Sequence, residues 1–89
     1  MKLQEKVQVK NRLGLHTRPA TLIVKMLQHC KSDVQFTCRK ETVNAKSILS
    51  ILMLAAKRNS RITITVDGED ADSIMDQLVT AFDTQFGES

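Results

Sequence analysis

One short stretch of this chain carries side chains that could do chemistry together. His16 is followed by Arg18 and then Pro19, and Gly14 allows a tight bend just before them. After Pro19 the sequence becomes apolar at helical spacing, and proline is tolerated in the first turn of a helix. The pattern predicts that His16 lies at or next to a helix N-terminus, whose free N–H groups and dipole favour anions. An imidazole nucleophile, a guanidinium and a helix N-terminus can together accept and hold a phosphoryl group.

A histidine at a helix start also has a simpler interpretation, as a cap or a partly buried polar residue. His29 offers a comparison within the chain, because it falls near the predicted C-terminus of the same helix, where a cation is favourable, and no neighbour could hold phosphate. A metal site on His29 and Cys30 would lack further ligands. Of the two histidines, only His16 therefore stands where it could hold a phosphoryl group, the simpler interpretation stays open for it at this point, and we expect no metal site.

The stretch 14–20, Gly-Leu-His-Thr-Arg-Pro-Ala, resembles the active-site signature of HPr, the histidine-containing phosphocarrier family of the bacterial phosphoenolpyruvate:sugar phosphotransferase system. The resemblance runs from Lys6 to the last predicted helix. It implies that the δ1 nitrogen of His16 accepts a phosphoryl group and that Arg18 clamps it. Thr17 and Pro19 would support the site.

The same resemblance implies the partners. Phosphoenolpyruvate would be the ultimate donor, through Enzyme I, and sugar-specific proteins of the EIIA type would be the acceptors. Such a protein is a stoichiometric phosphoryl carrier and not a turnover enzyme, and it needs no cofactor.

A second match covers residues 42–49, Thr-Val-Asn-Ala-Lys-Ser-Ile-Leu. It resembles the HPr segment whose serine is phosphorylated by the ATP-dependent HPr kinase in many bacteria, which makes Ser47 a candidate regulatory site. Serine is also a preferred helix N-cap residue. The two interpretations are compatible, because a phosphate on a cap serine lies at the positive end of the helix dipole.

The run 48–56 is too apolar for an ordinary surface helix unless part of it serves a partner. The resemblance selects Ile48, Leu49 and Met53, with Lys46 beside them, as the docking surface for Enzyme I and the acceptors. Any one of the apolar side chains could equally belong to the core. Methionine suits a surface that several partners share, because its side chain adapts in shape.

Composition limits the class of protein. The chain has 89 residues, a formal net charge of +3 and no tryptophan or tyrosine, which predicts one small domain spanning residues 1–89. The basic residues are interspersed with acidic ones and lack aromatic stacking partners, which argues against nucleic-acid binding. Cys30 and Cys38 fit no metal or redox spacing, no apolar run could span a membrane, and no signal region is recognisable, so we expect a reduced, cytoplasmic protein.

Hydrophobic periodicity predicts seven elements. Their order is strand 3–9, helix 17–29, strand 34–38, strand 41–44, helix 48–56, strand 61–66 and helix 71–86. This order favours an α+β, open-faced two-layer sandwich with three helices on one face of a four-stranded antiparallel sheet. The sheet order 1-4-2-3 is implied by the resemblance. A monomer is expected, since His16 must stay accessible to successive partners.

Two alternatives remain at this point. A regulatory protein similar to HPr could control enzymes or transcription factors by docking, or could serve a nitrogen-branch Enzyme I instead of sugar uptake. A nucleic-acid-binding α+β module is the other, and a steep salt dependence of oligonucleotide binding would reveal it.

Overall fold

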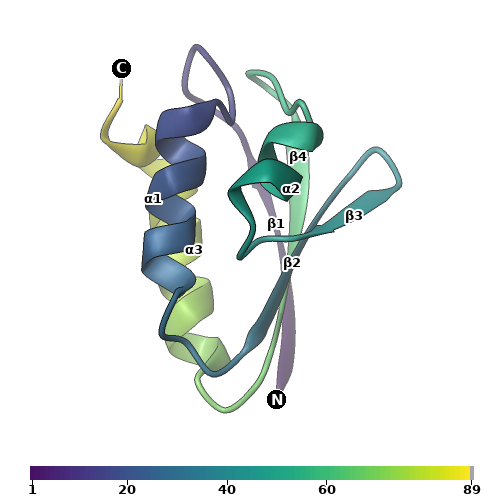
Figure 1. The fold of residues 1–89 in the computed structure, drawn as a ribbon, viewed down its shortest axis with the longest axis vertical. Helices are drawn as coiled ribbons and strands as arrows, with labels where there is room; N and C mark the ends of the chain where they lie inside the picture. Colours follow the sequence, from purple (N-terminus) through teal and green to yellow (C-terminus); the bar gives the residue numbers. More distant parts are fainter. Residues whose placement is uncertain (89) are drawn as a thin grey trace.

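The fold is an open-faced sandwich of one sheet and one layer of helices (Figure 1). The computed structural model describes residues 1–88. Its four strands are β1 (Lys2–Gln8), β2 (Asp33–Cys38), β3 (Glu41–Asn44) and β4 (Arg61–Asp67), and all neighbouring pairs are antiparallel. The strand order is β1-β4-β2-β3, which confirms both the predicted fold class and the predicted sheet order.

Side-chain alternation decides which face of the sheet is covered. Along β4, Ile62, Ile64 and Val66 are fully buried, and the intervening Thr63 and Thr65 face outward and are half-buried. In the register of the central strands, Phe36 of β2 lies opposite Ile64. The apolar face therefore carries the core, and the polar face is left uncovered by helices.

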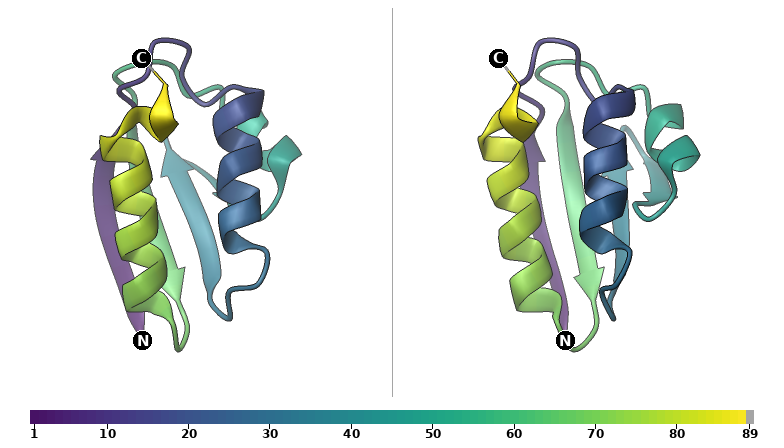
Figure 2. Two further views of the ribbon diagram at one scale, coloured as in Figure 1. Left: turned by 90° about the vertical axis from the view of Figure 1, so that its left-hand side faces the viewer. Right: turned by 60° about the vertical axis from the view of Figure 1, so that its left-hand side comes forward.

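Three helices pack on the apolar face (Figure 2). They are α1 (Thr17–Leu27), α2 (Ile48–Met53) and α3 (Ala71–Asp83), and α1 and α3 lie side by side in opposite directions. Ile23 and Leu27 of α1 and Leu78 and Phe82 of α3 are fully buried, as their helical spacing predicts. No helix among residues 1–88 is both long and apolar enough to cross a membrane.

All three predicted helices end earlier than the periodicity indicates. The first ends at Leu27 instead of residue 29, and the second ends at Met53 instead of residue 56, because Ala55 adopts a φ of 51°. Non-glycine residues seldom adopt this left-handed conformation. It turns the chain away from the helix.

The prediction that the last helix continues to residue 86 is also wrong, and here the early end changes the path of the C-terminal segment. It ends at Asp83, and a short 3₁₀ turn, η1 (Gln85–Gly87), follows with φ of 58° at Gln85 and 54° at Phe86. This reversal places the ring of Phe86 against that of Phe82, with centroids 4.9 Å apart. The aromatic contact anchors the C-terminal segment beside the β1–α1 loop (Figure 2).

Candidate functional site

His16 lies where the β1–α1 loop enters α1, and it is the N-cap residue of that helix. Its backbone is extended, with φ −80° and ψ −169°, and its carbonyl oxygen accepts the amide of Ala20 at 3.1 Å. The imidazole makes no capping bond of its own. The predicted position at the helix start is therefore confirmed, and the ring is free for other contacts.

The bend before His16 depends on Gly14, which has a φ of 70°. A Cβ at this position would run into the carbonyl of Ala56 and would lie 3.0 Å from the Cα of Lys57. The backbone around Gly14 is tied down on both sides, because its carbonyl accepts Nδ2 of Asn11 at 2.7 Å and the next amide, that of Leu15, donates to Ala56 at 2.9 Å. The loop that carries His16 is thus held against the segment after α2.

The first turn of α1 offers an anion a small number of donors. The amides of Thr17 and Arg18 have no intrahelical partner, whereas buried Pro19 has no N–H to offer. Thr17 and Arg18 are exposed, and the carbonyl of Thr17 accepts the hydroxyl of Thr21 at 2.8 Å. A phosphoryl group on His16 would therefore lie at the positive end of the helix dipole.

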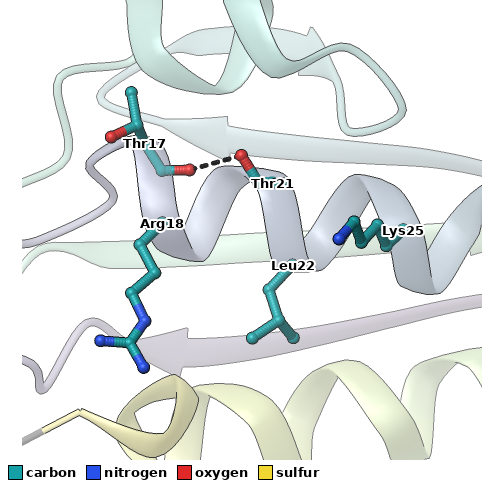
Figure 3. A pocket seen from close by; sticks show the side chains of 5 residues that line it. All are labelled: Thr17, Arg18, Thr21, Leu22 and Lys25. Carbon is teal, nitrogen blue, oxygen red and sulfur yellow. Dashed lines mark hydrogen bonds between the residues drawn. The ribbon is translucent and has the colours of Figure 1, made fainter.

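Arg18 reaches away from its own helix, towards the C-terminal segment (Figure 3). A shallow depression of about 290 Å³ lies between Arg12, Leu13, Arg18, Gly87 and Glu88. Its two guanidinium groups give it a positive character. A second depression, of about 360 Å³, lies along α1 and is lined by Thr17, Arg18, Thr21, Leu22 and Lys25.

Glu88, which contacts the imidazole directly, is not among the residues that sequence reasoning selects. Nε2 of His16 lies 2.9 Å and 3.0 Å from the two carboxylate oxygens, and Nδ2 of Asn11 donates to one of them at 2.9 Å. These contacts, chiefly the hydrogen bond from His16, hold the pKa of the Glu88 carboxyl below its ordinary value. No local pattern signals this contact, because the partners are separated by almost the whole chain.

Ser47 is the N-cap of α2, and its hydroxyl accepts the amide of Ser50 at 3.2 Å. The predicted capping role is confirmed. The side chain is half-buried, and the backbone amide of Lys46 just before it donates to Oδ1 of Asn44 at 2.9 Å.

The predicted docking residues lie on the outer side of α2. Ile48, Leu49 and Met53 are 38%, 68% and 69% exposed, whereas Ile51 is fully buried in the core. Helix α2 packs beside α1 (Figure 2). Among residues 1–88, the side chain of Ser47 bonds to the Ser50 amide and that of His16 to Glu88, so the structure does not join these two predicted site residues by a hydrogen bond.

Within residues 1–88, no three His, Cys, Asp or Glu side chains are grouped to hold a metal ion. His29 is exposed at the far end of α1 from His16. Cys38 is buried and Cys30 half-buried, and both are free thiols.

Known proteins are similar to this chain in both sequence and fold. A family model described as "PTS HPr component phosphorylation site" matches residues 3–84. The chain is 43% identical over 86 residues to the phosphocarrier protein HPr of Chlamydia pneumoniae, which covers 97% of this chain and 80% of that one. It is 34% identical to the phosphocarrier protein HPr of Xylella fastidiosa, with 97% of each chain covered.

Solved structures of HPr proteins have the same fold as this chain. The crystal structure of an HPr from Thermoanaerobacter tengcongensis superposes with a TM-score of 0.93 at 30% identity, covering 98% of both chains. That of the HPr from Bacillus anthracis superposes at 0.86 and 38% identity, covering 91% of this chain and 96% of the other. Sequence, topology and the histidine at the start of α1 lead to one conclusion: the chain belongs to the HPr family of phosphocarrier proteins of the phosphotransferase system.

Proposed function

We propose that this protein accepts a phosphoryl group from phospho-Enzyme I on His16 and passes it to sugar-specific acceptors of the EIIA type. The observation that carries the proposal is the position of His16 at the N-cap of α1, with Arg18 beside it in the first turn. The partners come from the family to which the chain belongs.

The division of roles follows from the chemistry of each group. A neutral imidazole nitrogen attacks phosphorus, and the resulting phosphoramidate is labile enough to be handed on. Arg18 can donate paired hydrogen bonds to phosphate oxygens. Thr17 contributes a backbone amide, and Pro19 fixes the backbone of the first turn.

The exposed apolar surface of α2 is suited to partners that dock next to His16. Exposed apolar side chains that lie together mark interaction sites on proteins of this size, and Ile48, Leu49 and Met53 lie on one side of α2. Lys46 and the basic side chains of α1 would attract an acidic partner surface. Phosphorylation of Ser47 by an HPr kinase would add negative charge at the edge of this surface and so regulate docking.

The test is phosphorylation of the intact protein, followed by mass spectrometry. Incubation with phosphoenolpyruvate, Mg²⁺ and a bacterial Enzyme I should add one phosphate, which acid then removes because phosphohistidine is acid-labile. His16→Ala should abolish the gain, whereas His29→Ala, the matched control, should retain it. Retention of the phosphate in His16→Ala would place the acceptor elsewhere and refute the assignment.

A negative result with one Enzyme I leads to a defined next step. The same measurement with a nitrogen-branch Enzyme I tests the alternative donor. If neither enzyme phosphorylates folded protein, a role in docking alone becomes the better explanation.

A further inference from the structure

The contact between Glu88 and His16 is built from well-anchored parts. Glu88 directly follows Gly87, whose φ is 75°, and the preceding Phe86 is only 5% exposed. Because Phe86 packs on Phe82, the backbone that carries Glu88 is fixed to the core. The carboxylate is therefore brought to the imidazole by the fold of the C-terminal segment.

A second residue holds the carboxylate in place from the other side. Asn11 is fully buried, and its Nδ2 donates both to the carbonyl of Gly14 at 2.7 Å and to Glu88 at 2.9 Å. The side chain of Glu88 is only 12% exposed, and that of His16 is 30% exposed. Asn11 thus links Glu88 to the same bend that orients His16.

The chemistry of the carboxylate determines which ring nitrogen carries the proton. An ionised carboxylate only accepts hydrogen bonds, and the hydrogen bonds from His16 and Asn11 hold the pKa of Glu88 below its ordinary value. Nε2, which faces both carboxylate oxygens, must therefore be the N–H of the ring. In the neutral imidazole, the lone pair is then on Nδ1.

We propose that Glu88 is a positioning residue for phosphoryl transfer, which holds His16 in the Nε2–H tautomer and turns Nδ1 towards the incoming phosphoryl group. This proposal rests on the proposed function. As the lone pair of Nδ1 forms the N–P bond, the bond from phosphorus to the donor breaks and its electron pair leaves with the donor. Nε2 keeps its proton, and the carboxylate offsets the positive charge that develops on the ring.

The tautomer can be measured without any phosphotransfer partner. The ¹⁵N chemical shifts of the His16 ring at alkaline pH, where imidazole is neutral, distinguish a protonated nitrogen from one with a lone pair. We expect the native protein to show Nε2–H alone. Glu88→Ala should move both nitrogen shifts towards a mixture of tautomers, and Glu88→Gln, which keeps an acceptor oxygen, should move them less.

The control is Glu69→Ala, because Glu69 is an exposed glutamate that contacts only Lys31, at 3.9 Å, among the described ion pairs. It should leave the His16 shifts unchanged. Backbone amide spectra of each variant report whether it is folded.

Phosphorylation rates complete the test. We expect the initial rate to fall about tenfold in Glu88→Ala, by analogy with the carboxylates that orient metal-binding histidines, and to recover in part in Glu88→Gln. Unchanged ring shifts in Glu88→Ala would overturn the proposal, and so would an unchanged or raised rate, which would make Glu88 a bystander or an obstruction. If the native protein accepted no phosphate, the proposed function would fail, and the ring shifts would still show whether Glu88 sets the tautomer.

Discussion

The carbonyl oxygen of Ala56 accepts the amide of Leu15 at 2.9 Å and so joins the segment after α2 to the bend before His16. The two segments are far apart in sequence, and each contains a residue in the left-handed conformation, Gly14 and Ala55. The geometry of the loop that carries His16 therefore depends on both turns.

Gly14→Ala should damage the site as well as the stability of the protein. A Cβ here meets the Ala56 carbonyl, and the left-handed conformation alone costs alanine about 1–2 kcal/mol. We expect a lower urea midpoint and slower phosphorylation of His16.

The matched control for stability is Gly87→Ala. Gly87 has a φ of 75°, but a Cβ there would meet nothing within 4 Å. Gly87→Ala should show only the cost of placing alanine in the left-handed conformation. The additional lowering of the urea midpoint in Gly14→Ala then measures the effect of the clash with Ala56. Equal losses would contradict the clash.

Ala55→Gly should make the protein more stable, although glycine usually has the opposite effect. Ala55 is exposed, and its φ of 51° follows the C-cap of α2. Glycine adopts the left-handed conformation there without strain, which stabilises the folded state. Its greater conformational freedom in the unfolded chain offsets part of this stabilisation. We expect a net increase of about 0.5 kcal/mol in the free energy of unfolding, measured with urea.

A glycine inside a helix supplies the contrast. Ala81→Gly in α3 should lower the free energy of unfolding by about 1 kcal/mol. Loss of stability in both variants would show that Ala55 is not strained.

The elements could be predicted from the sequence, but their ends could not. Alternation in β4 and helical spacing in α1 and α3 depend on burial of one face, which local patterns record. Helices α2 and α3 end two residues before Ala55 and Gln85, which adopt the left-handed conformation although neither residue type has a turn preference.

The same limit applies to the site. His16 and Arg18 could be selected as candidates because they are two residues apart in sequence and belong to one motif. Glu88 could not, because its contact with His16 depends on where α3 ends and how Phe86 packs. Long-range contacts of this kind leave no periodic signal in the chain.

Asp70 should make stability sensitive to acid. Its carboxylate accepts the hydroxyl of buried Ser32 and the amide of Lys31, and these hydrogen bonds, that of Ser32 first, hold the pKa of Asp70 below its ordinary 3.8. A lowered folded-state pKa gives a stabilising contribution that is complete above the unfolded value and is lost as the pH falls through the folded value.

Thermal unfolding as a function of pH tests this contribution. Asp70→Asn should lower the midpoint at neutral pH, and the difference from the native protein should shrink below pH 3.8. Asp72→Asn, a change in the same helix turn at an exposed position, serves as the control. A difference that stays constant with pH would contradict the assigned role of the carboxylate.

Ser47 allows the capping role to be separated from the proposed regulatory role. Ser47→Ala removes the acceptor of the Ser50 amide and should lower the free energy of unfolding by about 1 kcal/mol. Ser47→Asp keeps a good N-cap acceptor, so its stability should remain close to that of the native protein. The added charge lies beside exposed Ile48 and Leu49, where it should repel an acidic partner.

The rate of phosphorylation of His16 by Enzyme I distinguishes the two effects. It should fall in Ser47→Asp and stay unchanged in Ser47→Ala at a temperature where both variants are folded. Because the less stable variant is expected to be the more active one, a general loss of structure could not produce this pattern. Equal rates in both variants would show that the surface next to Ser47 does not dock Enzyme I.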